Sequence, residues 1–245
     1  MKKTLSLLIF ALLFAAGPLM SQKQLYFGIG GTGLSPLTIH QNTYGIGFFF
    51  DEKMTSFKAS ENVNIGFDFS KHLGLKVELG LTTLGQDYKD RTWDSAVYTR
   101  TIKMKYLQIP LLVKFRTSGK VGKFYLMAGP QLNLLSSATQ TYNKNGVQTD
   151  TNTTTLSGKI LHVGDSDIKN RYKSLDIMAR LDLGVDIIIA EHLLLNIGLT
   201  MAYGLTDINA TDYRRPDHTG NYNPSHNAYG GINVGLCYIL PIGSK

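Results

Sequence analysis

The stretch from Leu175 to Ile189 alternates between two kinds of side chain, and this period of two constrains the fold more than any other feature of the chain. One face is entirely apolar and consists of Leu175, Ile177, Ala179, Leu181, Leu183, Val185, Ile187 and Ile189. The opposite face carries the charged residues Asp176, Arg180, Asp182 and Asp186. Such alternation predicts a β-strand. About 15 residues is unusually long for a soluble strand, whereas a membrane-spanning strand needs ~9–11 residues and often extends past the hydrocarbon.

Residues 193–205 repeat this pattern after a short gap. Their apolar face consists of Leu193, Leu195, Ile197, Leu199, Met201, Tyr203 and Leu205. A tight turn at Ala190 and Glu191 between two long alternating strands is typical of an outer-membrane barrel, in which the apolar face meets lipid and the charged face lines the interior. The alternative is a soluble β-sandwich or a lipocalin-like barrel, but the outward face of such a fold should be polar.

The first residues have the features of an export signal. Two lysines precede an apolar run over residues 5–16, a Gly-Pro break and the small residue Ser21. This order predicts a secretory signal peptide over residues 1–21 that is cleaved before Gln22. The run is shorter than the ~20 residues that a membrane-spanning helix needs. We therefore expect the mature chain, residues 22–245, to form a single outer-membrane barrel domain.

Eight alternating runs are bounded by turn residues. They cover residues 24–33, 60–70, 73–86, 101–116, 123–136, 175–189, 193–205 and 227–240. Three connections are short (71–72, 117–122 and 190–191) and four are long and polar (34–59, 87–100, 137–170 and 206–226). This alternation is typical of bacterial barrels with periplasmic turns and outer loops. The predicted fold is all-β, an eight-stranded antiparallel up-and-down transmembrane β-barrel with both termini in the periplasm. Residues 44–50 are β-prone and leave an additional strand open.

An eight-stranded barrel has an interior just wide enough to be filled by side chains. The alternation directs nine charged residues inward: Asp68, Lys76, Glu78, Lys114, Arg116, Asp176, Arg180, Asp182 and Asp186. Buried charges must be paired or hydrogen-bonded. These residues therefore predict an internal salt-bridge network that stabilises the barrel and blocks a wide pore. A charge-lined ion path or proton relay is the alternative function for the same set.

The segment Lys105-Tyr106-Leu107-Gln108-Ile109-Pro110-Leu111-Leu112 resembles the N-Y-L-E-I-P-L-L strand of small outer-membrane barrels of the Bacteroidetes, described as PorT-like or outer-membrane β-barrel-domain (porin-like) proteins. Ala128-Gly129-Pro130-Gln131-Leu132 is similar to the A-G-P strand of that family, and the resemblance extends from about Tyr26 to Tyr238. Two features depart from the family pattern. Gln108 replaces the common Glu, and seven residues follow Tyr238, where barrel assembly usually favours a terminal aromatic residue. The resemblance implies an outer-membrane location, and one branch of the family is associated with a secretion machine.

Other motifs point only weakly to chemistry. Residues 28–33 fit G-x-G-x-x-G, but Pro36 follows and no helical run continues, so we interpret them as barrel glycines and not as a nucleotide site. A lipid-modifying enzyme could use loop-borne groups as base and nucleophile, and the candidates are His162, Asp165 and Ser166. Three more histidines, His40, His218 and His226, fall in expected loops without metal-ligand spacing. We predict no catalytic residues, no cofactor and no metal.

The predicted function is a non-enzymatic structural, adhesion or secretion-accessory role, with outer loops that contact partners. The alternatives are a narrow porin-like channel and, less favoured, a lipid-modifying barrel enzyme. Expected partners are outer-membrane lipid and lipopolysaccharide, paired with loop cations such as Arg214 and Arg215, the barrel-assembly machinery, and envelope or secretion-system proteins. The net charge of +7 is scattered, so no nucleic-acid partner is expected. An interfacial aromatic girdle is expected from Tyr88, Trp93, Tyr98, Tyr203 and Tyr229.

Overall fold

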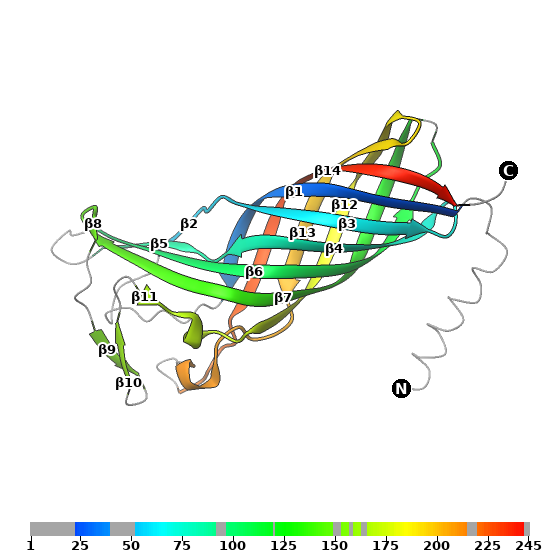
Figure 1. Ribbon diagram of the computed structural model, residues 1–245. Helices are drawn as coiled ribbons and strands as arrows, with labels where there is room; N and C mark the ends of the chain where they lie inside the picture. The colour runs from blue at the N-terminus through cyan, green and yellow to red at the C-terminus, as the bar shows by residue number, and fades with distance from the viewer. Residues whose placement is uncertain are drawn as a thin grey trace, which may run out of the picture.

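The computed structural model describes residues 23–39, 52–91, 97–119, 121–148, 153–156, 159–162, 166–214 and 220–242. Eight long strands dominate these residues and lie side by side in a tilted array (Figure 1). They are β1 (Lys23–Ile39), β3 (Lys58–Asp68), β4 (Leu73–Leu84), β6 (Val97–Arg116), β7 (Gly122–Lys144), β12 (Leu175–Ala190), β13 (Leu193–Gly204) and β14 (His226–Ile242). None of the described helices has the length and apolar character needed to cross a membrane.

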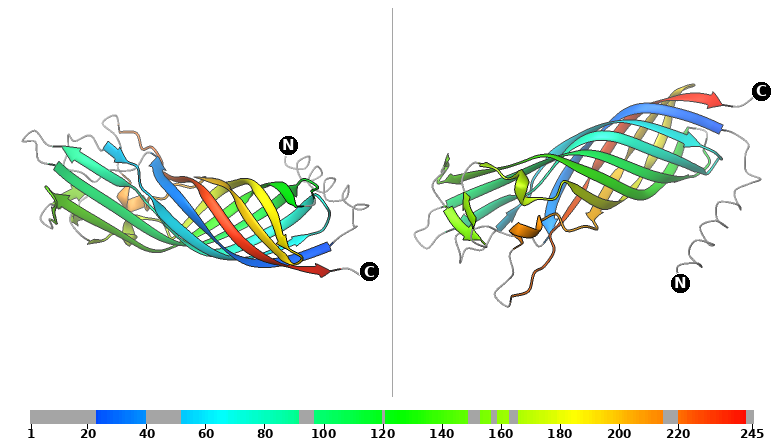
Figure 2. Two further views of the ribbon diagram at one scale, coloured as in Figure 1. Left: turned by 90° about the horizontal axis from the view of Figure 1, so that it is seen from above. Right: turned by 60° about the horizontal axis from the view of Figure 1, so that its bottom comes forward.

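The eight long strands form a closed antiparallel ring (Figure 2). Each pairs with the next long strand of the chain, and β1 also pairs with β14. A path of paired residues that leaves β1 at Leu25 and crosses every strand returns to β1 at Ser35, ten residues farther along. This stagger tilts the strands by about 40° from the ring axis. The predicted all-β class and ring of eight strands are confirmed.

The two ends of the ring differ. At the terminal end, Lys23 pairs with Ile242 and short turns join β3 to β4, β6 to β7 and β12 to β13. In the first of these turns, the Ser70 hydroxyl accepts hydrogen bonds from the backbone N–H groups of His72 and Leu73, at 3.2 and 2.9 Å. A serine that satisfies turn amides in this way permits a tight reversal. The opposite end, which we call the loop end, carries all the long connections (Figure 1).

The outward face of the ring is apolar around its circumference. Phe124 and Ile29 are 68% and 64% exposed, and the exposed apolar set also includes Phe27, Val63, Ile65, Leu79, Leu81, Leu111, Val113, Phe115, Leu132, Leu134, Leu183, Leu199, Met201, Ile232, Val234 and Leu236. The inward face is buried and rich in charged, amide and hydroxyl side chains. Cys237 is buried and its Sγ lies 3.4 Å from Asn64 Oδ1. Apolar side chains outside and polar side chains inside are the reverse of the usual distribution in a water-soluble protein.

Much of what the sequence predicted as loop is strand, which corrects several boundaries. β1 continues to Ile39, β6 begins at Val97 and β7 continues to Lys144, each beyond its predicted limit. Shorter elements surround the loop end: β2 (Glu52–Met54), β5 (Asp87–Arg91), β8 (Val147–Gln148), β9 (Thr153–Leu156), β10 (Lys159–His162), β11 (Ser166–Asp167) and the 3-10 helices η1 (Lys169–Arg171) and η2 (Thr211–Tyr213). The possible strand at residues 44–50 lies outside the described residues.

A β-bulge on β7 marks the point where the two longest strands change character. Lys105 pairs with Ser137 and Tyr106 pairs with Leu135, so Ser136 is an extra residue whose Oγ donates to the Lys105 carbonyl at 2.9 Å. On the terminal side of the bulge, the outward residues of β6 are apolar. On its loop side they are polar, namely Lys105, Lys103 and Thr101. Because the apolar alternation of β7 ends here, the sequence pattern ended that strand at Ser136, eight residues too early. The predicted start of β6 at Thr101 lies beyond the bulge and only four residues inside the observed start.

The prediction of an outward-facing aromatic girdle is wrong for two of its five residues. Tyr88 and Tyr229 point inward and are buried. The Arg100 guanidinium lies over the Tyr88 ring, with its Cζ 4.8 Å from the ring centroid. The Tyr229 hydroxyl donates to Gln131 Oε1 at 2.8 Å. Their strand register places them on the inner face, which sequence spacing near a loop did not resolve. Tyr203 does face outward. Trp93 lies outside the described residues, as does the side chain of Tyr98.

Candidate functional site: the barrel interior

A chain of ion pairs crosses the middle of the ring. Arg180 of β12 donates from Nε and Nη2 to the two carboxylate oxygens of Asp182, at 2.9 Å each. Its Nη1 donates to Glu78 Oε2 of β4 at 2.8 Å, and Glu78 Oε1 lies 2.8 Å from Lys76 Nζ. The Thr200 hydroxyl of β13 donates to Asp182 at 2.5 Å. All five side chains are buried, and two acids balance two bases.

The contact between Glu78 and Arg180 joins opposite walls. In the ring, β4 and β12 are separated by β6 and β7 on one side and by β13, β14, β1 and β3 on the other. The interior hollow beside this ion-pair chain measures only about 10 Å³, roughly the limit for one water molecule. Removing one partner of a buried ion pair usually costs about 3–5 kcal/mol, since the other charge is left uncompensated. The ion-pair chain therefore both fills the ring and ties its walls together.

A second group of ion pairs lies nearer the terminal end. Lys114 Nζ is 2.5 Å from Asp186 Oδ2, and Asn196 donates to the other Asp186 oxygen at 2.7 Å. Arg116 Nη1 lies 2.6 Å from Asp68 Oδ2. These contacts connect β6 with β12, β13 and β3. They complete the pairing of every predicted inward cation with an acid.

Asp176 differs from the other inward acids because amide and hydroxyl groups hold its carboxylate. Asn227 Nδ2 donates to Asp176 Oδ2 and the Thr206 hydroxyl to Oδ1, at 3.0 Å each. Asn227 also donates to the Tyr106 hydroxyl at 3.2 Å. Such bonds satisfy a buried carboxylate without a counterion. All nine predicted inward residues lie within the ring, and eight of them belong to the two ion-paired groups.

An apolar cluster fills the interior toward the loop end. Its members come from the ring and from the connections: Leu34, Leu84, Tyr88, Ile102, Met104, Tyr106, Leu135, Ala138, Ile168, Tyr172, Met178, Ala202, Ile208 and Tyr229. Ile168 and Ile208 come from connections, so loop residues contribute to the same packed unit as ring residues. This part of the interior has the composition of a soluble protein core.

Asp207 organises the connection between β13 and β14. Its carboxylate accepts hydrogen bonds from the Tyr222 hydroxyl at 2.9 Å and from the backbone N–H groups of Asn209 and Ser225 at 3.1 Å. Arg214 Nε adds an ion pair at 3.0 Å. Partial burial and the hydrogen bond to Asp207 raise the pKa of the Tyr222 phenol. The Asp207 cluster therefore orders a segment that sequence patterns predicted only as a loop.

The candidate catalytic and metal-binding residues are not assembled by the described structure. His162 ends β10, whereas Ser166 begins β11 and pairs with Gln140 of β7. Asp165 lies outside the described residues, as do His40 and His218. His226 begins β14, where its ring stacks on Tyr203 at 5.6 Å, so its expected loop position is wrong. Within the described ranges, no group of histidine, cysteine and acidic residues could hold a metal ion.

Sequence reasoning also missed uncharged members of the interior. Tyr125 donates to Asn196 and Asn233 at 3.2 and 3.3 Å, and Gln131 donates to Asn133 at 2.8 Å. All of these residues share the inward parity of their strands, so the alternation that located the charges could have located them too. Residues 28–33 of the G-x-G-x-x-G motif lie within β1. They are part of a strand and lead into no helix.

A closed antiparallel ring with an apolar outside and a filled polar inside defines the class of outer-membrane-type β-barrels. The chain belongs to the outer membrane protein beta-barrel domain family, whose family model matches residues 19–210. This membership supports an outer-membrane location. The narrower PorT-like assignment within the Bacteroidetes stays a prediction. No curated protein matched the sequence in a separate comparison.

Three solved structures of low sequence identity each align with most of this chain. Neisserial surface protein A is 14% identical, with 87% of this chain and 96% of that chain covered and a TM-score of 0.44. A major outer membrane protein from Thermus thermophilus is 14% identical, with 89% and 99% covered and a TM-score of 0.45. The attachment invasion locus protein Ail of Yersinia pestis is 9% identical, with 90% and 100% covered and a TM-score of 0.42.

Proposed function

We propose that the chain spans the outer membrane as an up-and-down barrel with a closed lumen and has a non-enzymatic structural, adhesion or secretion-accessory role. The observation that carries this proposal is the ion-pair chain from Lys76 through Glu78 and Arg180 to Asp182, which crosses the interior. The apolar cluster obstructs the same path toward the loop end. A lumen obstructed twice is suited to holding a rigid scaffold in the membrane and not to passing solutes.

The length of the apolar band supports a membrane-spanning position. Outward apolar residues on β6 run from Leu107 to Phe115, nine residues, and on β7 from Phe124 to Leu134, eleven residues. A tilted strand needs ~9–11 residues to cross the hydrocarbon. Both segments end at the bulge, beyond which the outward face is polar. The band therefore fits one bilayer, with the loop end on one side and the paired strand ends Lys23 and Ile242 on the other.

The strands beyond the bulge supply the partner-binding part of this proposal. β5, β6, β7 and β8 project past the other strands at the loop end (Figure 1). Their polar outward face includes Lys103 and Thr139, which are exposed. The motif at residues 105–112 begins at this boundary and motivates the PorT-like, secretion-accessory version of the role. Adhesion and secretion partners would both meet this projecting sheet first.

Current through planar lipid bilayers tests the closed lumen. The full chain, extracted from outer membranes in mild detergent, should insert without steady conductance, while a general porin in the same bilayer gives open-channel steps. A steady, ion-selective current from the wild-type chain would contradict the proposal and favour the narrow-channel alternative.

Incubation with outer-membrane lipids tests the absence of enzymatic chemistry. Mass spectra of the lipids should be unchanged by the wild-type chain and by His162→Ala and Ser166→Ala variants. If the wild-type chain removed an acyl chain from the lipid and either variant did not, the lipid-modifying alternative would be supported instead.

A further inference from the structure

One carboxylate faces outward within the apolar band. Glu61 of β3 pairs with Gly31 of β1 and with Leu81 of β4, and its side chain is exposed. Among the described residues, no ion pair involves it. Glu61, Leu81 and Leu107 are paired across β3, β4 and β6. Because the strands are tilted, each successive member of this row lies nearer the loop end, so Leu81 and Leu107 lie nearer the loop end than Glu61. Ionisable groups at such positions are rare and mark functional sites.

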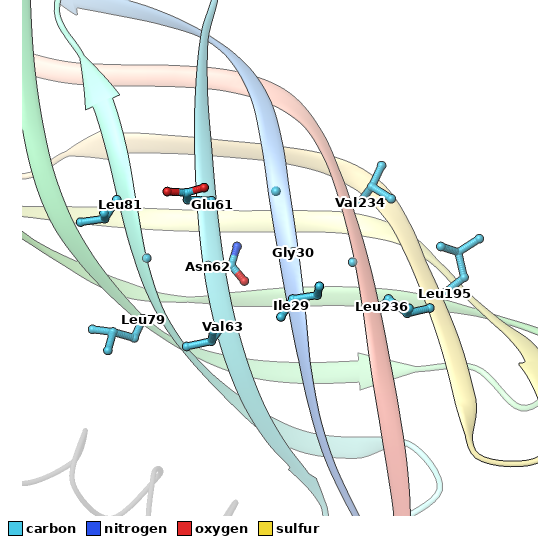
Figure 3. A pocket seen from close by; sticks show the side chains of 13 residues that line it. Ile29, Gly30, Glu61, Asn62, Val63, Leu79, Leu81, Leu195, Val234 and Leu236 are labelled. Atoms are coloured by element: carbon cyan, nitrogen blue, oxygen red, sulfur yellow. The ribbon is translucent and has the colours of Figure 1, made fainter.

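An apolar hollow lies beside and below this carboxylate (Figure 3). Its volume is about 660 Å³, and it extends across β13, β14, β1, β3 and β4. Gly31 leaves the space open on β1, beside the bulky side chains of Ile29 on the same strand and Val234 on β14. The hollow is lined chiefly by Ile29, Gly31, Val63, Leu79, Leu81 and Leu236. A hydrocarbon chain fits this lining.

A second hollow adjoins the first on the loop side and is more polar. Its volume is about 480 Å³, and it shares Glu61 and Leu81 with the first. Lys105, Thr83 and Ser136 line its far side. The two hollows together form what we call the Glu61 groove. Glu61 lies where the two hollows meet, and Lys105 lies on the loop side of the second hollow.

We propose that the Glu61 groove binds one phosphorylated glycolipid of the outer leaflet. Its acyl chain would occupy the apolar hollow, Lys105 would pair with a phosphate, and Glu61 would accept hydrogen bonds from sugar hydroxyl or amide groups. Phosphate pairing by an ammonium group and hydroxyl pairing by a carboxylate are both charge-assisted hydrogen bonds. Hydrogen-bond donors from the lipid would satisfy a carboxylate that otherwise faces hydrocarbon.

The order of the two charges along the membrane normal selects this class of lipid. Glu61 and Lys105 are two strands and two residues apart, and Lys105 lies nearer the loop end. In an ethanolamine phospholipid the phosphate lies between the ammonium group and the acyl chains, so the phosphate would meet the deeper Glu61 and be repelled. In a phosphorylated glycolipid, sugar hydroxyl and amide groups lie between the phosphate and the acyl chains, which matches the order Lys105, Glu61 and apolar hollow. The inference depends on the proposed membrane position but not on the closed lumen.

Native mass spectrometry of the detergent-solubilised full chain, titrated with lipid A or with phosphatidylethanolamine, tests the proposal. Wild-type protein should retain one lipid A and bind it at least about tenfold more tightly than phosphatidylethanolamine. Glu61→Gln and Lys105→Gln should each weaken lipid A binding roughly tenfold, as loss of one charge-assisted contact predicts. Lys103→Gln, the next outward lysine on β6, is the matched control and should bind as wild type does.

A steric pair of variants tests the acyl-chain hollow independently. Gly31→Leu should fill the hollow and abolish retention, whereas Gly33→Leu adds the same bulk to β1 where no atom lies within 4 Å of the new Cβ, so its binding should be unchanged. Equal affinity for both lipids, or equal lipid A binding by all variants, would overturn the proposal. A heat-sensitive gel shift checks that each variant is folded. Failure of the wild type to insert into bilayers would instead count against the proposed membrane position.

Discussion

The same two strands, β6 and β7, build opposite structures on the two sides of the bulge at Ser136. On the terminal side, their outward residues are apolar and their inward residues include Gln108, Lys114 and Gln131. On the loop side, the outward residues are polar, while Ile102 and Met104 point into the apolar cluster. On these two strands, the outward face and the main filling of the interior therefore change at the same place. In the proposed membrane position, hydrocarbon lies outside the ion-paired interior and water lies outside the apolar cluster.

The bulge makes this inversion possible on β7. A single extra residue shifts the faces of a strand by one position. Leu135 faces inward before the bulge, and Ala138 and Tyr142 face inward after it. If β7 continued through Ser136 as a regular strand, its parity would place Ala138 and Tyr142 on the water-facing side. The bulge therefore coincides with the edge of the apolar band because that is where the pattern must change.

The largest predicted effect comes from the ionic half. Arg180→Met leaves Glu78 and Asp182 with Lys76 as their remaining base, so the free energy of unfolding should fall by about 3–5 kcal/mol. Denaturant titration of the barrel in lipid vesicles measures this change. Lys103→Met removes an outward cation beyond the band and should change stability by no more than about 0.5 kcal/mol. Equal losses from both variants would contradict a structural role for the ion-pair chain.

The apolar half should behave like a soluble core. Leu84 is buried on the inner face of β4, and Leu84→Ala should cost about 2–5 kcal/mol because it leaves a cavity. Leu81 is outward on the same strand, where lipid chains can close around the shorter side chain. Leu81→Ala should therefore cost within about 1 kcal/mol. The same unfolding titration compares them, and the reverse order would show that the faces of β4 are misassigned.

Arginine on the outward face should distinguish the two sides of the bulge. Leu111→Arg places a cation within the apolar band and should destabilise the barrel by about 2–4 kcal/mol. Thr101→Arg makes the matched change on the same face of β6 beyond the bulge, with a cost near zero to about 1 kcal/mol. Unfolding in vesicles measures both. If Leu111→Arg were as stable as Thr101→Arg, hydrocarbon would not surround Leu111.

The smallest effect should come from the Asp207 cluster. Tyr222→Phe removes the phenol donor to Asp207 and should cost about 0.5–1.5 kcal/mol, confined to the connection between β13 and β14. Hydrogen exchange should accelerate at the amides of Asn209 and Ser225, which donate to the same carboxylate. Exchange in β12 should stay as in the wild type. Acceleration throughout the barrel would show that this connection supports the whole fold.

Sequence periodicity predicted the ring because one uniform environment acts on all eight strands. The outward positions of β12 and β13 are apolar along almost their full length, so strand number, order and inward charges followed from parity alone. The predicted strand ends were wrong where the environment changes along a single strand. β7 continues eight residues past its predicted end at Ser136, but its outward residues become polar there and resemble a loop.

Contacts between distant segments could not be predicted in the same way. The partner of Arg180 is set by ring closure and stagger, which bring Glu78 across the lumen from a strand 102 residues away. Asp207 and Tyr222 meet through the course of a connection that has no period. Glu61 satisfies the strand pattern in every respect except its charge. That exception could have been noticed, but its groove depends on the glycines of the neighbouring strand.

Spin-label accessibility along the outward face of β6 tests the central claim most directly. Single cysteines at seven alternate positions would each carry the label, while buried Cys237 remains unlabelled. The labelled positions are those of Thr101, Lys103, Lys105, Leu107, Ile109, Leu111 and Val113.

In lipid vesicles, the three sites from Thr101 to Lys105 should be more accessible to a water-soluble nickel reagent. The four sites from Leu107 to Val113 should be more accessible to oxygen, which concentrates in hydrocarbon. We expect the change to fall between Lys105 and Leu107, beside the bulge. Nickel accessibility that is uniform along the strand, or an oxygen-rich zone that continues to Thr101, would contradict a membrane boundary at this point.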